Sequence, residues 1–308
     1  YNVKDEVCMA CIVAALGASL IYGLINNLDS HLVARRMPGV RAFLLAFSIV
    51  ILVLIQPFVY LFPFPEGLAS TIVASALVSA LMRAGAVLLM IFSFKSEEVV
   101  GVVPLIYTYP VFVALAAMPL LGETLNIWQW LAIIVVVFGA ATVALRPRSS
   151  GNGRWLGKNF PLLIIAALLF AGSDLSAKYA LEEISSFTLY WVSMLVLVVI
   201  SLCISLRPSV IRSYKNIENP RKATALLILN ESLVLGASML GFWAMKNGPI
   251  SLVSTILASR PVFVFGVAII LSRLFPGFVF WQSDRRALGY KFVAVLFIIV
   301  GIAIIYLA

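Results

Sequence analysis

Residues 98–113 read EVVGVVPLIYTYPVFV, and a related stretch at residues 249–264 reads PISLVSTILASRPVFV. Within them, Pro110–Val113 and Pro261–Val264 are identical and stand at a constant offset. Further pairs at this offset or a nearby one are Lys95 with Lys246, Ala86 with Ala237, and Gly23 with Gly172. The chain therefore contains an internal repeat, with one copy in each half.

The whole chain is as apolar as these two stretches. Of its 308 residues, 63% are hydrophobic and 11% are charged, whereas soluble domains carry about 25% charged residues. A bilayer core about 30 Å thick needs about 20 apolar residues per spanning helix. We expect ten spanning helices, in an all-α membrane fold, at 8–28, 41–62, 70–94, 98–121, 127–146, 160–180, 187–206, 223–245, 250–272 and 288–308.

Each repeat would hold five of these helices, in residues 1–150 and 151–308. The Gly-, Ser- and Arg-rich linker from Arg146 to Asn159 separates them. Because five is odd, the second repeat would enter the membrane inverted relative to the first. Inverted repeats are typical of transporters that work by alternating access, in which one half rocks against the other.

Basic residues predict the orientation, because Lys and Arg stay on the cytoplasmic side. Seventeen of them fall in loops after odd-numbered helices and only Lys4, Lys178 and Lys246 fall on the other side. This count predicts that both termini lie outside. It also explains the net charge of +9 without a nucleic-acid partner, because the charges sit at helix ends.

Other classes lack the residues that they need. Cys8 and Cys11 have metal-ligand spacing, but no second pair or nearby His supports a site, so we expect no metal and no cofactor. No His/Glu zinc motif, Gly-x-Ser-x-Gly or membrane-placed Asp pair supports an intramembrane enzyme. Helix 8–28 is too long, and lacks a small-residue cleavage site, for a removable signal peptide.

Residues 105–123 read LIYTYPVFVALAAMPLLGE. This stretch resembles the fourth helix of EamA-type members of the drug/metabolite transporter superfamily, with its mid-helix proline and final Gly-Glu. Trp130–Ala141, with Gly139, resembles the fifth helix. Two features depart from the family: Ser272-Arg273 replaces the Gly-Glu in the second repeat, and members are generally drawn with both termini in the cytoplasm.

The resemblance implies a ten-helix basket around a central cavity formed by helices 1, 3, 4, 6, 8 and 9. The fifth and tenth helices are nearly pure apolar here, which suits pillars that face lipid or a second copy in a homodimer. The stretch Ser254–Arg260 resembles the ninth helix of sugar-phosphate/phosphate antiporters, in which basic residues after a small-polar stretch hold the substrate phosphate.

Polar residues inside predicted spans mark the candidate site, because an ionisable group in a bilayer costs about 2.5–3.5 kcal/mol on insertion scales. The substrate-binding candidates are Tyr22, Asn26, Arg83, Tyr109, Asp174, Glu231 and Arg260. Each also has a structural interpretation. Asp174 and Lys178 can form a local ion pair, and the two arginines can form a cluster with Glu231, the nearest candidate acid. Ser19, Tyr22, Asn26 and Asp29 can line a cavity or bond neighbouring helices, Tyr107 and Tyr109 can simply pack, and His31 can be incidental.

The sequence therefore favours a plasma-membrane transporter, not an enzyme, for a small anionic or zwitterionic metabolite: an amino acid, an organic acid or a phosphorylated compound. A flippase for a lipid-linked anion, such as a polyprenyl phosphate derivative, is the alternative within transport. A signalling or assembly subunit is the alternative outside it, although such a protein needs neither the inverted repeat nor the buried arginines.

Overall fold

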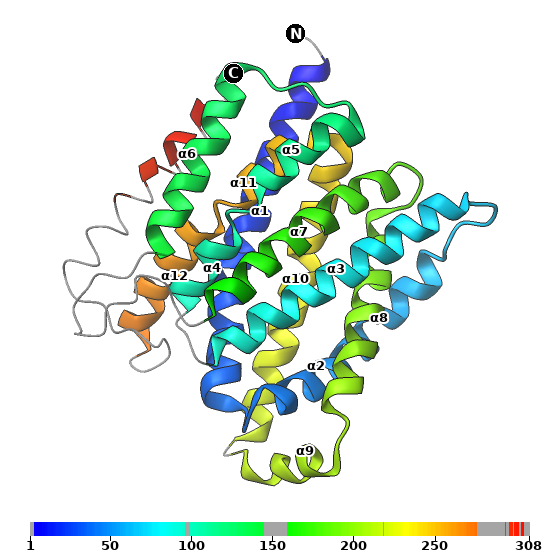
Figure 1. Cartoon of the computed structure of the whole chain (residues 1–308). Coiled ribbons are helices and arrows are strands. Elements are labelled where there is room, and N and C mark those ends of the chain that lie inside the picture. The colour runs from blue at the N-terminus through cyan, green and yellow to red at the C-terminus, as the bar shows by residue number, and fades with distance from the viewer. Residues whose placement is uncertain are drawn as a thin grey trace.

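The computed structural model describes residues 3–95, 99–144, 159–217 and 219–275, together with single residues between 293 and 304. This part of the chain is all helical (Figure 1). Its elements are α1 (Val3–His31), the π-helical turn η1 (Leu32–Arg36), α2 (Val40–Leu61), α3 (Ser70–Phe94), α4 (Val99–Ile106), α5 (Pro110–Leu121), α6 (Ile127–Ala144), α7 (Phe160–Ala180), α8 (Ser186–Ser205), α9 (Pro208–Ser213), the 3-10 turn η2 (Tyr214–Asn216), α10 (Pro220–Asn247), α11 (Ile250–Leu257) and α12 (Arg260–Leu274).

Eight segments of the described chain are long and apolar enough to cross a membrane, and they agree with eight of the predicted spans. The fifth predicted span corresponds to α6, whose clearly placed apolar part, Ile127–Gly139, is shorter. The predicted tenth helix at 288–308 lies outside the described residues, apart from single positions in it. The structure thus establishes an all-helical, multi-pass membrane fold.

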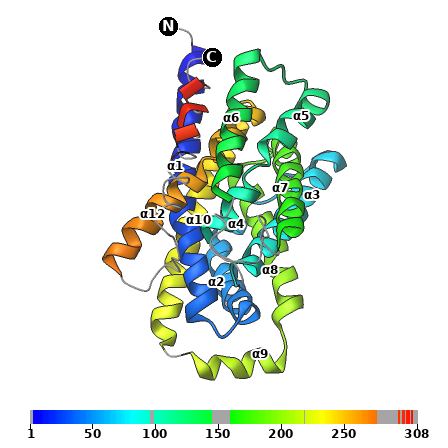
Figure 2. The same cartoon turned by 60° about the vertical axis from the view of Figure 1, so that its left-hand side comes forward.

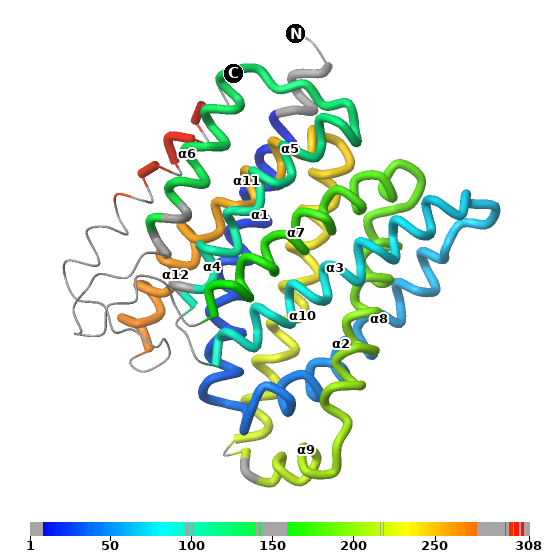
Figure 3. Tube along the Cα trace, in the orientation of Figure 1, coloured from blue at the N-terminus to red at the C-terminus, as the bar shows by residue number. Residues whose placement is uncertain are grey.

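The fourth and ninth spans are not the continuous helices that the sequence predicted. Three turn residues separate α4 from α5, and two separate α11 from α12; Figure 3 lets the chain be followed through both breaks. Pro110 is the first residue of α5 and Pro261 the second of α12. A proline has no N–H and its ring clashes with the preceding turn, so a helix ends before it and a new one begins on it.

Long-range helix pairs build the bundle. Helix α3 packs along α7, α1 packs along α10, and α2 packs against α8, so every one of these contacts joins the two halves of the sequence. Gly23 lets α1 approach closely, because a Cβ there would lie 2.5 Å from the Cβ of Phe263 in α12. The interior consequently belongs to both halves together, while many large apolar side chains face outward, as lipid contact requires.

The two ends of the bundle differ in charge. The N-terminus and the α5–α6 connection lie at one end, and α9 lies across the other (Figures 1 and 2). We call the second of these the α9 end and the first the α5 end. Arg207, Arg212 and Lys215 belong to the α9 end, and Glu123 belongs to the α5 end. Among the described residues, these three basic side chains therefore lie at the end of the bundle opposite Glu123.

Candidate substrate cavity

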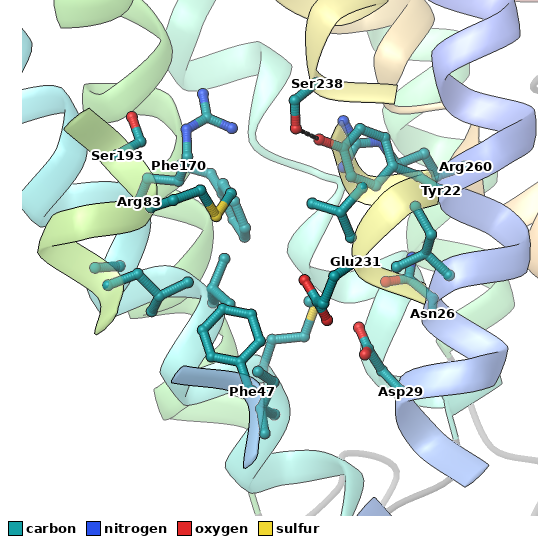
Figure 4. A pocket seen from close by; sticks show the side chains of 18 of the residues that line it. Tyr22, Asn26, Asp29, Phe47, Arg83, Phe170, Ser193, Glu231, Ser238 and Arg260 are labelled. Carbon is teal, nitrogen blue, oxygen red and sulfur yellow. Dashed lines mark hydrogen bonds between the residues drawn. The ribbon is translucent and has the colours of Figure 1, made fainter. Parts of the chain in front are cut away.

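A cavity lies among the helices. All six helices expected to form it contribute side chains, for example Tyr22 from α1, Phe170 from α7 and Glu231 from α10. Helices α2 and α8 add Phe47 and Ser193, which the sequence did not indicate (Figure 4). Since the lining includes the start of α2 and the end of α3, the cavity extends from the middle of the bundle toward the α9 end.

Arg83 forms an ion pair with Asp174, with 2.8 Å between the guanidinium Nη2 and the carboxylate Oδ1. Its guanidinium also lies over the ring of Phe242, 5.0 Å from the centroid. Tyr109 lies close to the same carboxylate. This is the only ion pair within 4.0 Å among the residues that the structure places, and it joins α3 to α7.

Two of the structural interpretations considered from the sequence are therefore wrong. Asp174 does not pair with Lys178, because Lys178 Nζ instead donates to the carbonyl oxygens of Met245 and Gly248, 2.8 Å away in each case. Those carbonyls belong to the end of α10, where the last turn leaves its acceptors free. Nor does Glu231 pair with Arg83, because Asp174 on α7 lies closer to that arginine. The residue pattern along one helix cannot show which residue of another helix comes nearest.

Arg260 has a different environment. It is 7% exposed and begins α12, directly at the break. Its Nη1 donates to the hydroxyl of Tyr107, and its guanidinium lies 3.8 Å from the ring centroid of Tyr22 and 4.8 Å from that of Tyr107. Its Nε is buried without a hydrogen-bond partner, and no carboxylate of the described chain lies within 4.0 Å. Aromatic faces thus hold the cation in place and leave its charge uncompensated.

Glu231 lies in a carboxyl pair with Asp29. The side-chain nitrogen of Asn230 donates to both, at 2.9 Å to Asp29 Oδ1 and 3.0 Å to Glu231 Oε1. All three side chains are buried. The predicted Arg–Glu–Arg cluster is therefore absent from the described residues, because Glu231 is joined to α1 and not to an arginine.

Of the seven candidates, five line the cavity: Tyr22, Asn26, Arg83, Glu231 and Arg260. Tyr109 and Asp174 are buried and do not line the cavity. Asp174 is connected to the cavity by its ion pair with Arg83. The polar face of α1 has both predicted uses. Tyr22, Asn26 and Asp29 line the cavity, while Ser19 Oγ donates to the carbonyl of Ile256, 3.2 Å away, beside the α11–α12 break.

Three further residues were not selected from the sequence. Asp29 had been noted only as part of the helix face, and Ser193 and Ser238 carried no pattern of their own. Ser238 Oγ lies 2.7 Å from the hydroxyl of Tyr22, which orients the ring that covers Arg260. His31, the last residue of α1, is buried, and its Nε2 accepts from Arg36 Nε at 3.1 Å, so it is bonded to the η1 turn and does not line the cavity.

Glu123 connects the two halves at the α5 end. It follows Gly122, whose φ of 66° ends α5 in the left-handed conformation that glycine adopts easily. Its carboxylate accepts from the backbone N–H of Ile250 at 2.5 Å, from the N–H of Ser251 at 3.1 Å and from Ser251 Oγ at 2.6 Å. The Gly-Glu of the first half therefore caps the N-terminus of α11 in the second half, where free N–H groups and the helix dipole favour an anion.

The comparisons with known proteins agree with this architecture. A crystal structure, titled only as that of a protein, aligns with 99% of this chain and 96% of its own, with a TM-score of 0.65 and 16% identity. At that identity the likeness shows the fold alone. No curated protein matches the sequence. Residues 9–145, from α1 through α6, match the EamA-like transporter family. The chain is therefore a multi-pass membrane protein whose first half is similar to the EamA-like transporter family.

Proposed function

We propose that this protein is a secondary transporter that moves a small anionic or zwitterionic metabolite across the plasma membrane by alternating access. One observation carries the proposal: Arg260 is a buried guanidinium that lines the cavity at the start of a half-helix and has no carboxylate partner in the described chain. A bound carboxylate or phosphate would supply the missing charge, and the planar fork of arginine suits either group.

Other unsatisfied groups in the cavity favour the same class of substrate. Asn26 Nδ2 and Arg83 Nε are buried donors without acceptors, and Ser193 Oγ is a hydroxyl without a partner. Buried polar groups are normally hydrogen-bonded, so such groups in one cavity point to a ligand that accepts hydrogen bonds. The nearby carboxylates of Asp29 and Glu231 would suit the ammonium group of a zwitterion.

The arrangement of the helices supports ten spans in two inverted repeats. The equal half-helices α4 and α11, of eight residues each, lie at the offset found in the sequence. The contacts also exchange as a pseudo-two-fold axis requires, because α3 on α7 corresponds to α10 on α1. Helices α1 and α7, the first of each half, run in opposite directions in Figure 1. Discontinuous helices at the interface of such repeats are where transporters bind substrate.

Alternating access further needs a closure that can open. Glu123, bound to the start of α11, joins the halves at the α5 end. Lys178 and Lys246 donate to backbone carbonyls at the same end. The cavity extends toward the other end. We infer a state that is closed at the α5 end, and we infer that transport breaks these polar contacts and forms others at the α9 end.

The substrate site is tested by thermal stabilisation of the purified protein with amino acids, organic acids, organic phosphates and lipid phosphates. We expect one soluble anion to stabilise the wild type, and we expect Arg260→Gln to abolish that stabilisation while changing the unliganded Tm little. Arg260→Lys should also fail, because an ammonium cannot form the fork. Arg273→Gln is the matched control, since Arg273 is an exposed arginine on the same helix.

Two outcomes would contradict the proposed site. Normal anion binding by Arg260→Gln would exclude Arg260 as the anion-binding group. Stabilisation by lipid phosphates alone would favour the flippase.

Orientation is tested with single cysteines in a cysteine-free background. Glu66 and Arg207 are exposed in connections on opposite sides of the predicted topology. With both termini outside, Glu66→Cys should react with an impermeant thiol reagent on intact cells, and Arg207→Cys should react only after permeabilisation. The reverse result would place the termini in the cytoplasm, as is usual in the family.

A further inference from the structure

The carboxyl pair of Asp29 and Glu231 lies beside the proposed anion site but is not explained by it. Within the described chain, the amide nitrogen of Asn230 is the only hydrogen-bond donor to either carboxylate. Asn230 is fully buried, Glu231 is 2% exposed and Asp29 is 8% exposed. Figure 4 shows the two carboxylates facing each other at one end of the cavity. Two acids thus share a single neutral donor away from bulk water.

Two buried acceptors at this position have no partner: Glu231 Oε2 and Asn230 Oδ1. Unsatisfied acceptors indicate a missing donor, just as the unsatisfied donors elsewhere in the cavity indicate a missing acceptor. The amide of Asn26 is buried and also unpartnered at its nitrogen, and it lines the same part of the cavity. The pair therefore has room for hydrogen bonds that the described chain does not complete.

No cation of the described chain neutralises the pair. The charged and titratable groups on the surrounding elements are Tyr22 and His31 on α1, Arg35 and Arg36 on η1, Arg83 on α3, Tyr107 next to α4, Tyr190 on α8 and Arg260 on α12. Arg83 is paired with Asp174, and Arg260 is bound to the hydroxyl and ring of Tyr107. None of the bases among them lies within 4.0 Å of either acid.

Two carboxylates in such a place cannot both ionise cheaply, because each destabilises the charge of the other and burial destabilises both. A proton is the smallest ligand that removes this conflict, since it turns one acceptor into a donor. A metal ion fits less well, because the NH₂ group of Asn230 already occupies the position between the carboxylates that the ion would need.

We propose that Asp29 and Glu231 form a proton-binding site, with the proton on Glu231 Oε2, and that proton uptake there favours anion binding at Arg260. The coupling follows from the charges in the cavity. The charges of Arg83 and Asp174 compensate each other, which leaves one cation, Arg260, and the two carboxylates of Asp29 and Glu231. Each proton that binds to a carboxylate removes a negative charge and so makes the cavity more favourable for an anion. By linkage the effect is reciprocal, so the anion also favours the proton. Only the coupling rests on the proposed function; proton binding does not.

Proton binding is measured without any substrate, by infrared titration of the protonated carboxyl band in detergent-solubilised full-length protein. We expect a band that appears as the pH is lowered, that Glu231→Gln removes, and that Asp29→Asn shifts to another pH. Glu66→Gln, an exposed carboxylate outside the cavity, is the matched control and should leave the band unchanged. The absence of a titrating band in the wild type, or its persistence in Glu231→Gln, would overturn the site.

A second measurement, of thermal stability, asks whether sodium binds to the carboxyl pair in place of a proton. At fixed pH, replacing choline with sodium should leave the Tm unchanged; a sodium-specific rise that Glu231→Gln abolishes would show a metal cation in place of the proton.

Coupling is measured with inorganic phosphate and with glutamate as probe anions, at several pH values. We expect the affinity to rise as the pH falls, by at most tenfold per pH unit for one linked proton, and to lose this dependence in Glu231→Gln. If Arg260→Gln abolishes anion binding while the carboxyl band remains, both sites stand. If neither probe binds the wild type but the band titrates, the proposed anion specificity fails and the proton site stands. Affinity that is independent of pH in the wild type would overturn the coupling.

Discussion

The two discontinuous helices have the same construction and different chemistry. Helices α4 and α11 have the same length, and each is followed by a short break and a proline. The first break carries Tyr107-Thr108-Tyr109, and the equivalent positions of the second carry Ala258-Ser259-Arg260. The repeat therefore provides two equal openings in the helical backbone, but only one holds a positive charge. Under the proposed function, the scaffold is shared between the halves and anion recognition belongs to the second half.

The two buried arginines show the same division. Arg83, on α3 of the first half, has a carboxylate partner on α7 and joins the halves. Arg260, at the second break, has aromatic neighbours and no carboxylate partner among the residues described. Arg83 should accordingly contribute more to stability, and Arg260 more to binding.

The largest expected effect tests this contrast. Arg83→Met should destabilise the protein by about 3–5 kcal/mol, because it leaves the buried Asp174 without its ionic partner. The double variant Arg83→Met/Asp174→Asn should recover much of that loss. Arg260→Met should destabilise the protein clearly less, because it leaves no buried carboxylate without a partner. Thermal and denaturant unfolding in one detergent give all three values; equal losses for the two arginine variants would remove the distinction between them.

The next effect concerns the repeated glycines. A Cβ at Gly23 would lie 2.5 Å from Phe263 Cβ and 2.9 Å from its backbone carbonyl carbon, whereas a Cβ at Gly172 would meet the side chain of Met82 at its sulfur. Backbone cannot move aside as a flexible methionine can. Gly23→Ala should therefore cost about 1–3 kcal/mol, as overpacking does, and Gly172→Ala should cost less. The unfolding midpoints of the two variants decide the order, and the reverse order would show that α1 and α12 can separate cheaply.

The smallest effect concerns the closure at the α5 end. Glu123→Ala leaves the N–H groups of Ile250 and Ser251 without their cap, which should cost about 0.5–2 kcal/mol. Leu274, the last residue of α12, is an exposed apolar side chain, so Leu274→Ala is a near-neutral control.

Cys11 offers a direct measurement of this closure, because it is buried and lies next to Gly248. In a Cys8→Ser/Cys203→Ser background, Glu123→Ala should raise its rate of modification roughly fivefold, the factor that corresponds to about 1 kcal/mol. An unchanged rate would mean that Glu123 does not hold the halves together.

The sequence alone determined the class of the protein and much of its outline. Apolar length predicts the spans, because a bilayer of fixed thickness demands it, and the spacing of Arg and Lys predicts which loops share a side. The energetic cost of a buried charge also marked Arg83 and Arg260 as residues of interest. The inference of spanning helices succeeds because it depends on one segment and its solvent. For the same reason the prolines at 110 and 261 were visible, although the sequence did not show that the helices break at both.

Only the tertiary structure decided which residues meet. Asp174 was assigned to Lys178 because the two lie one turn apart, yet helix packing brings Arg83 to Asp174 and the carbonyls of α10 to Lys178. Glu231, which the sequence offered as a partner for the two arginines in one structural alternative, lies with Asp29. The Gly-Glu at 122–123 was visible as a motif, but its target, the start of α11, lies in the other half. Partners across helices depend on how two helices are rotated and spaced against each other, which no periodicity along one helix can specify.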